Sequence, residues 1–425
     1  MRYLVKPFTN EKNQFIFCIF GFFWVSNIGR FVGSTFLLRI LIYPVFLLLL
    51  IIFMRLLFQV KTKKQDINTI TYNIFLCLLI LSCICVARGI PSYLNIDILR
   101  TLLFDLTGSA LVWLMPLSLL FALKKEFWLI WIPKIKLIVI IGCFYALIIT
   151  LFNISHRSLL EFKMYNSSDF LFIAPFLIIW SRLKNNSTEL IIGYIGVGLA
   201  IISMFLVNER FAIVYTGLIC IFFVIAIFFG KYRTDVKINM FASGFVFILI
   251  TTIVLSQVPF FQRYIDTYLI QGKILEDTRG GDSLSSAVIN NMTISEFIFG
   301  KGNSGVYIWG HRGWPPQPYI RNNVEIGYMQ LMLKGGYTLL TAFLALSLYA
   351  VYLGIFRSNN RITQYLACII IARLIIMSTA MPPRIGFEYF MYWLVIGGCL
   401  SKAFRSQTDN AILSQCNSKK LIIKW

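Results

Sequence analysis

Arginines and aromatic side chains gather in one polar stretch of the chain, residues 259–325. The stretch contains His311, Arg312 and Trp314 in one cluster, with Arg279 before them and Arg321 after them. A guanidinium group keeps its charge and grips phosphate or carboxylate through two parallel hydrogen bonds. Aromatic faces beside such groups suit sugar rings that carry phosphate. The alternative is an ordinary loop with a small apolar core of its own.

A carboxylate, Glu325, closes this stretch shortly before Tyr328. Its position marks the start of an apolar helix, where partial desolvation would raise the pKa of the carboxyl group unless a nearby arginine offset it. Such a carboxylate suits a general base that takes a proton from a sugar hydroxyl. The alternative is a helix-start carboxylate that the helix dipole favours.

Arg210 follows Glu209 at the start of another predicted helix. A cation at this end opposes the helix dipole, so helix stability does not explain the residue. Free backbone N–H groups beside a guanidinium would form a phosphate pocket. The alternative is a side chain that reaches for lipid headgroups or pairs with Glu209.

Arg39 and Arg373 stand within apolar runs, where an arginine is costly unless it faces a polar cavity or a partner. Arg373 is followed by further polar residues, among them Arg384 and Glu388. Structural pairing and contact with a ligand stay equally open for both intramembrane arginines. On the ligand interpretation the substrate-binding residues include Arg39, Arg373 and Arg384, together with Tyr328.

Membrane helices must position these residues, because 58% of the chain is hydrophobic and only 13% is charged. Soluble domains run nearer to half apolar and a quarter charged. We expect an all-α, polytopic integral membrane protein of about twelve helices, or ten or eleven if the short first and sixth do not cross fully. The predicted helices are 15–28, 33–54, 68–87, 104–123, 135–153, 169–181, 189–207, 211–229, 239–258, 330–355, 364–381 and 386–403.

The basic residues between helices predict the orientation. With both termini in the cytoplasm, every predicted inner connection is basic, as the positive-inside rule requires. The stretch 259–325 is then one long extracytoplasmic loop. Lysine predominates among the residues assigned inside and arginine among those assigned outside. This split favours an outer site for an anionic ligand, the alternative being a drift in composition.

Several classes of function lack support in the sequence. The net charge of +21 lies in short connections rather than in a folded basic domain, which argues against nucleic-acid binding. Motifs for ATP hydrolysis and zinc binding are absent, so we expect no cofactor and no metal. The nine cysteines are expected to pack as small apolar residues. The glycine-rich run 300–305 matches a dinucleotide motif only formally and predicts a flexible turn.

Two segments resemble the O-antigen polymerase and ligase superfamily: Phe299-Gly300-Lys301-Gly302, and residues 325–336 that begin Glu-Ile-Gly-Tyr and end Lys-Gly-Gly. Members of this superfamily are polytopic inner-membrane glycosyltransferases with a long periplasmic loop between late helices. The resemblance implies transfer of glycan from an undecaprenyl-pyrophosphate carrier to an acceptor hydroxyl, without nucleotide sugar or metal. It covers the topology of the whole chain, and the sequence mainly in 200–340.

The resemblance also implies roles for individual residues. Arg210 and Arg279 would hold the pyrophosphate and stabilise the leaving charge. Glu325 would act as the base, while Arg312 and Arg321 would grip pyrophosphate or glycan. The ligase branch has a His-Asn pair just before the helix that follows the loop. In this chain Glu325 and the apolar residue after it occupy that place, which favours the polymerase branch.

We therefore expect a polymerase of lipid-linked oligosaccharide repeat units on the outer face of a bacterial inner membrane. One alternative is an O-antigen ligase that transfers glycan to lipid A core. Another is a flippase or transporter of lipid-linked sugars, which favours internal repeats and short outer loops. The implied partners are undecaprenyl-pyrophosphate-linked oligosaccharides, the lipid bilayer, a chain-length regulator and a flippase.

The expected organisation has four parts. Residues 1–258 form a bundle of nine helices, and 259–325 form the large periplasmic loop. Residues 326–403 add three helices, and 404–425 form a basic cytoplasmic tail.

Overall fold

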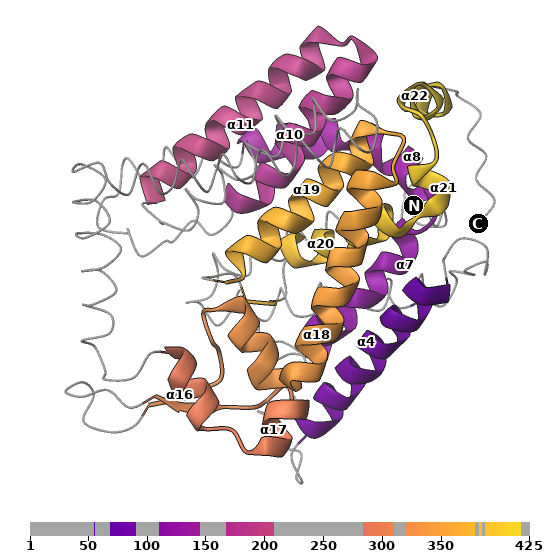
Figure 1. Ribbon diagram of the computed structural model, residues 1–425. Helices are drawn as coiled ribbons and strands as arrows, with labels where there is room; N and C mark the ends of the chain where they lie inside the picture. The colour runs from indigo at the N-terminus through magenta and orange to yellow at the C-terminus, as the bar shows by residue number, and fades with distance from the viewer. Residues whose placement is uncertain are drawn as a thin grey trace, which may run out of the picture.

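The computed structural model describes residue 55 and residues 69–90, 110–144, 167–207, 284–309, 319–378, 382–384 and 387–417. This part of the chain is mostly helical, as predicted, with one two-stranded sheet (Figure 1). Three of its helices are long and apolar enough to cross a membrane, which indicates a membrane protein. Four predicted helices (15–28, 33–54, 211–229 and 239–258) lie outside the described residues, so the count of twelve stays a prediction.

Helix α4 (Thr69–Arg88) is one of the three membrane-crossing candidates. It runs for 20 residues without glycine or proline and ends where Gly89 follows. This helix confirms the prediction of 68–87 to within one residue at each end.

Proline interrupts the next helical stretch. The described part of the predicted helix 104–123 consists of three pieces, α6 (Ala110–Leu114), η3 (Met115–Ser118) and α7 (Leu119–Ala122). Pro116 has no N–H to donate, so the chain tightens there into a 3₁₀ turn.

A second membrane-crossing candidate spans Lys125–Phe144. It begins as α8 (Lys125–Trp131) and continues through the short η4 (Ile132–Lys134). The prediction placed a connection at 124–134 and the helix at 135–153, so the predicted start is wrong. The basic residues suggested a connection, but Phe127, Trp128 and Trp131 are buried and fix this segment as a packed helix.

Helices α10 (Ser167–Lys184) and α11 (Ser187–Val207) form an antiparallel pair. At 18 residues, α10 is longer than the predicted 169–181. The tight turn between them places Asn185 at a φ of 53°, a left-handed conformation that asparagine tolerates better than most residues.

Helix α18 (Gly327–Phe356) is the longest described helix and is sharply bent at Gly336. There φ is +71°, which separates a short arm, 327–335, from a long arm, 337–356. Figure 1 shows the two arms meeting at an angle near α17 (Ile294–Phe299). A Cβ atom at Gly336 would lie 2.2 Å from the carbonyl oxygen of Ile298, so both the conformation and the close approach require glycine.

The C-terminal part consists of α19 (Arg361–Ile376), α20 (Phe387–Leu400), α21 (Lys402–Arg405) and α22 (Asp409–Asn417). The start of α19 is capped by Asn360, whose side chain accepts a hydrogen bond from the N–H of Thr363 at 2.8 Å. The predicted basic tail from residue 404 therefore begins with helices, and Cys416 of α22 contacts the carbonyl of Leu129.

Aromatic side chains fill the space between α18 and α20. The ring of Phe343 stacks on Tyr392 with centroids 5.7 Å apart and meets Trp393 edge-on at 5.6 Å. All three side chains are buried. Inside a membrane such contacts stabilise helix pairs by close packing rather than by transfer from water.

The described part of the predicted loop forms a small folded unit. It contains α16 (Leu284–Asn290), α17, and the antiparallel strands β1 (Tyr307–Trp309) and β2 (Tyr319–Arg321). Its apolar core includes Val288, Tyr307 and Val324 together with Leu333 of α18. The core predicted by the alternative interpretation of the loop is therefore present, and it anchors the loop on α18.

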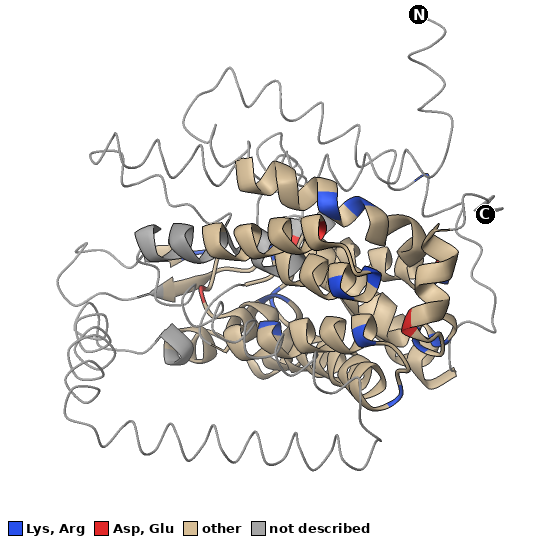
Figure 2. Ribbon diagram, turned by 90° about the horizontal axis from the view of Figure 1, so that it is seen from above, with Lys and Arg blue, Asp and Glu red and all other residues tan. Residues whose placement is uncertain are grey.

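The arrangement of the helices gives the molecule two distinct ends. The turn between α10 and α11, the C-terminal end of α18, and α21 lie toward one end, while α16 and α17 lie toward the other (Figure 1). Most of the described Lys and Arg residues gather toward one end of the bundle, with long uncharged stretches of helix beyond them (Figure 2). Which side faces the cytoplasm stays a prediction.

Candidate functional site

Two arginines meet one carboxylate where the end of α19 approaches the start of α20. Arg373, in the last turn of α19, forms an ion pair with Glu388, in the first turn of α20. The Nη2 atom of Arg384 lies 3.8 Å from the second oxygen of Glu388. We call these three residues the arginine corner. Its formal charge is +1.

Local helix electrostatics favour this arrangement. A cation is stabilised at a helix C-terminus and an anion at a helix N-terminus, where Arg373 and Glu388 stand. The two side chains are 1% and 4% exposed, so neither charge can rely on water. Arg384 is less buried, at 19% exposed, and is the member of the corner more open to a ligand. The interpretation of Arg373 as a structurally paired residue is therefore confirmed, with Glu388 as its partner.

Tyr328 joins the corner to the short arm of α18. Its hydroxyl donates a hydrogen bond to the carbonyl of Leu374, and its backbone N–H donates to the carbonyl of Met377 at 3.2 Å. Both acceptors belong to the end of α19, next to Arg373. The bend at Gly336 thus turns the short arm so that its first residues dock beside the arginine corner (Figure 1).

Arg321 and Glu325 lie just before the short arm. The Nη2 atom of Arg321, in β2, is 3.8 Å from Oε1 of Glu325. The Glu325 side chain is 71% exposed, so the expected partial desolvation is not found. The reason is local: α18 is capped at Ile326, which leaves Glu325 on the turn outside the helix. An exposed carboxylate can meet a hydroxyl group that arrives from water.

Two buried side chains support the turn that precedes α18. Buried Gln330 accepts a hydrogen bond from the N–H of Val324 at 2.8 Å. The buried Tyr307 of β1 pairs with Arg321 across the hairpin, and its hydroxyl lies 3.4 Å from the carbonyl of Asn323. Burial raises the pKa of the Tyr307 hydroxyl, and the charge of Arg321 opposes that rise. Tyr307 is therefore a neutral support for the turn.

Lys334 is an important residue that the sequence did not single out. It is fully buried, and its ammonium group donates to the carbonyls of Asn303 and Gly305, each at 2.8 Å. Its own carbonyl accepts from the N–H of Gly302 at 2.9 Å. Lys334 stands between apolar residues and a Gly-Gly pair, and this pattern could have indicated its role. A buried ammonium group must find hydrogen-bond acceptors.

These contacts fix the glycine turn, residues 300–305. Gly302 has a φ of +86°, and a Cβ atom there would lie 2.4 Å from the backbone nitrogen of Gly89 at the end of α4. Ser304 also donates to the carbonyl of Gly89, at 2.6 Å. The prediction of a flexible turn is therefore wrong: the run is a packed joint between α4, the loop and α18.

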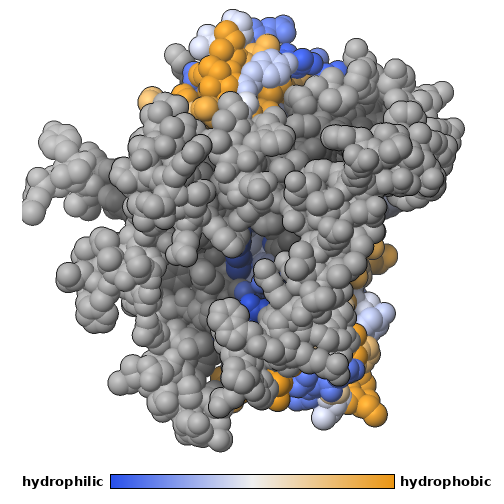
Figure 3. Space-filling view, turned by 90° about the vertical axis from the view of Figure 1, so that its left-hand side faces the viewer, coloured by the Kyte–Doolittle hydropathy of each residue, from blue (hydrophilic) through white to orange (hydrophobic). Residues whose placement is uncertain are grey.

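The remaining predicted site residues lie outside the described residues: Arg39, Arg210, Arg279, His311, Arg312 and Trp314. Of the eleven predicted positions, the structure brings Tyr328, Arg373 and Arg384 together. Arg321 and Glu325 lie just before Tyr328 in the chain and form an ion pair of their own. Figure 3 views the molecule from the left-hand side of Figure 1 and shows a few hydrophilic described residues near the centre of that face.

Within the described ranges no group of three His, Cys, Asp or Glu residues could hold a metal ion. The cysteines there are free thiols. Three of them, Cys85, Cys368 and Cys399, are buried as predicted, whereas Cys77 and Cys83 are exposed on α4.

No protein-family model, no curated protein and no solved structure matches this chain. The chemistry of the site follows from its own residues.

Proposed function

We propose that this chain is a membrane glycosyltransferase that polymerises undecaprenyl-pyrophosphate-linked oligosaccharide repeat units into surface polysaccharide. The reaction would take place on the outer face of a bacterial inner membrane. The observation that carries the proposal is the arginine corner beside Tyr328, at the point where the predicted outer loop enters α18.

The corner has the charge that a diphosphate requires. Both guanidinium groups lie beside Glu388, and the three residues together carry a formal charge of +1 in a largely buried setting. Arginine binds phosphate oxygens in pairs, and its attraction strengthens where water is scarce. Arg384, with its greater exposure, would make the first contact. Arg210 and Arg279 would complete the grip, as the resemblance implies.

The proposed step is a direct displacement. The acceptor hydroxyl of a new lipid-linked repeat attacks the anomeric carbon of the growing chain. The bond between that carbon and the pyrophosphate oxygen breaks, and its electron pair leaves with undecaprenyl pyrophosphate. Guanidinium groups stabilise the developing negative charge. The anomeric configuration inverts.

Glu325 would receive the hydroxyl proton. Its carboxylate is exposed, which suits an acceptor sugar that approaches through water, and Arg321 restrains its position at 3.8 Å. Tyr328 lies in the first turn of α18 and donates a hydrogen bond to α19, so it links the turn that carries the proposed base to the arginine corner.

A reconstituted assay tests the proposal. Purified protein in liposomes receives lipid-linked repeat units extracted from cells that lack the gene, and the products are separated on a gel. We expect ladders of repeats from the wild type. Arg384→Gln and Glu325→Gln should each lower ladder formation about a hundredfold. Arg182→Gln is the matched control, because Arg182 is exposed and contacts only the Tyr194 hydroxyl among the described residues.

The outcomes separate the rival functions. Normal ladders from both site variants would overturn the site assignment. Single transfer to core sugar without ladders would indicate a ligase instead. Movement of the carrier between leaflets with no new glycosidic bond would indicate a flippase.

A further inference from the structure

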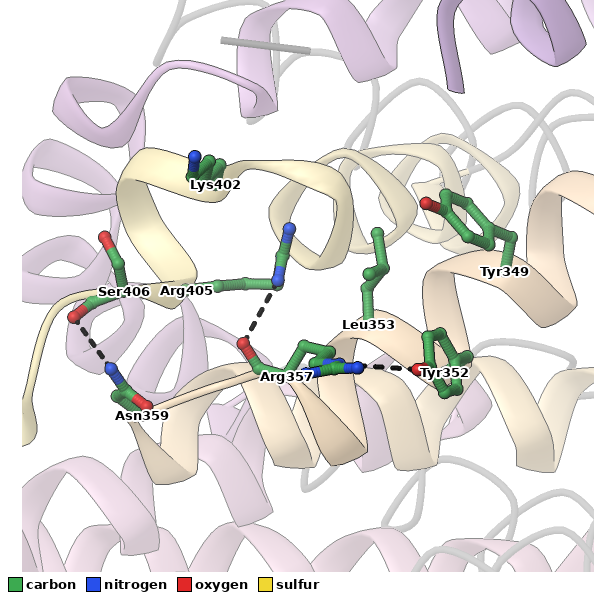
Figure 4. Close-up of a pocket in the computed structure, with 8 residues that line it drawn as sticks. All are labelled: Tyr349, Tyr352, Leu353, Arg357, Asn359, Lys402, Arg405 and Ser406. Carbon is green, nitrogen blue, oxygen red and sulfur yellow. Dashed lines mark hydrogen bonds between the residues drawn. The ribbon is translucent and has the colours of Figure 1, made fainter. Parts of the chain in front are cut away.

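A second basic site lies at the opposite end of α18 and α19, where a cavity of about 450 Å³ opens between α18 and α21. Its walls carry three cationic side chains, Arg357, Lys402 and Arg405, and two phenol rings, Tyr349 and Tyr352 (Figure 4). We call this space the basic cavity. It is separate from the arginine corner and does not depend on the proposed function.

No acidic residue lines the basic cavity among the residues that the structure describes. In the described part of the chain, none of the five ion pairs involves Arg357, Lys402 or Arg405. Three positive charges thus line one cavity, and like charges repel one another. A bound anion would relieve that repulsion.

Arg405 provides independent support for a ligand. Arg405 is only 9% exposed, and its Nε atom is buried with no hydrogen-bond partner among the residues that the structure describes. An unsatisfied buried donor on a charged group is costly, so a missing acceptor is expected nearby. Burial also lowers the pKa of Arg405, because desolvation disfavours its charged form.

The cavity is firmly built rather than a gap between loose side chains. Arg405 donates through Nη1 to the carbonyl of Arg357 at 3.1 Å, and the N–H of Asn359 donates to the carbonyl of Arg405 at 2.8 Å. Arg357 in turn donates through Nε to the Tyr352 hydroxyl at 3.3 Å (Figure 4). Arg357 and Lys402 are themselves exposed, so a ligand can reach them.

The chemistry favours phosphate. Guanidinium groups match phosphate oxygens geometrically, and a nearby ammonium group adds charge. The cavity lies on the side that the basic residues predict to be cytoplasmic, where anionic headgroups gather and basic pockets between helices bind them. Tyrosines are enriched at that interfacial depth.

We propose that the basic cavity binds a phosphate group, carried by an anionic phospholipid of the predicted inner leaflet or by a soluble phosphate, and that the bound group clamps the end of α18 to α21.

The test uses full-length protein in nanodiscs of phosphatidylcholine. Dioleoylphosphatidylglycerol is added in increasing fractions in one arm, and inorganic phosphate in the other. Binding is read as lipid retained in native mass spectra and as the rise in unfolding temperature. The test variant is R357Q/K402Q, which removes two exposed charges from the cavity. The control, R182Q/K134Q, removes one exposed Arg from α10 and one exposed Lys from η4, and neither belongs to an ion pair among the described residues.

We expect the wild type and the control to bind alike and R357Q/K402Q to bind at least about tenfold more weakly, since each charge near the headgroups is worth about 1 kcal/mol. If R357Q/K402Q binds phosphatidylglycerol more weakly, the ligand is a phospholipid. If it binds only inorganic phosphate more weakly, the ligand is a soluble phosphate. Equal binding by all three proteins, or binding by none, would overturn the proposal. A cooperative unfolding transition in phosphatidylcholine alone shows that the double variant is folded. If the double variant does not fold, the single variants R357Q and K402Q are tested in its place.

Discussion

The arginine corner and the basic cavity lie at opposite ends of α19 and use positive charge in opposite ways. At the corner, two guanidinium groups converge on one buried carboxylate, and Arg373 is 1% exposed. In the basic cavity, three cations face no carboxylate among the described residues, and two of them are exposed. We therefore propose that the corner's charges support the fold as well as a ligand. The cavity's exposed charges are proposed to serve a ligand and to contribute little to the fold.

Removing the shared carboxylate should have the largest effect on stability. Glu388→Gln removes the carboxylate that pairs with the buried Arg373, so we expect a loss of about 3 kcal/mol in the free energy of unfolding. Denaturant unfolding in mixed micelles measures it. Asp409→Asn is the matched control at the more exposed Arg361–Asp409 pair and should cost about 1 kcal/mol or less. Equal losses would break the comparison.

The bend that brings Tyr328 to the corner should be the next most sensitive feature. Gly336→Ala places a Cβ atom 2.2 Å from the carbonyl of Ile298 at a φ of +71°, so we expect a loss of about 2 kcal/mol and reduced glycan transfer. Gly198→Ala in α11 meets nothing within 4 Å and should be neutral or slightly stabilising. Thermal unfolding measures both variants. Equal midpoints would show that the bend accepts a Cβ atom at residue 336, which would contradict the prediction.

Lys334 should matter somewhat less, because its loss affects hydrogen bonds rather than backbone geometry. Lys334→Met leaves two buried carbonyls without a donor, which should cost about 1–2 kcal/mol. Hydrogen exchange in 300–305 should accelerate. Lys301→Met removes one exposed hydrogen bond to Val306 and should leave exchange in the glycine turn nearly unchanged. Matching exchange rates would show that Lys334 does not hold the turn.

The exposed charges of the basic cavity should have the smallest effect. R357Q/K402Q should change the free energy of unfolding by no more than about 0.5 kcal/mol in phosphatidylcholine nanodiscs. Denaturant titration measures this change. A loss as large as that of Glu388→Gln would show that both ends of α19 depend on charge for folding.

The sequence predicted the helices where apolar runs were uninterrupted. The match is close for α4 and for the start of α11, which was predicted at residue 189 and lies at Ser187. It fails where one residue changes the local geometry. Pro116 divides a predicted helix, and the aromatic core extends α8 into a predicted connection. Neither effect has a signature in hydropathy alone.

The candidate site was predictable only in part. An arginine in an apolar run signals a need for a partner, and the polar residues after Arg373 did include that partner, Glu388. The bend at Gly336 could not be predicted, because it depends on a contact with Ile298, which is distant in sequence. The exposure of Glu325 likewise depends on where α18 begins, and helix starts are set by tertiary contacts such as those of Tyr328.

The most direct test of the central claim is the affinity of the purified protein for undecaprenyl pyrophosphate in nanodiscs. The account predicts tight binding to the wild type and to Arg182→Gln, and binding at least about tenfold weaker to Arg384→Gln, because a guanidinium contact to a charged group is worth about 1.5–3 kcal/mol. An unchanged affinity in Arg384→Gln would contradict the assignment of the arginine corner as the diphosphate site.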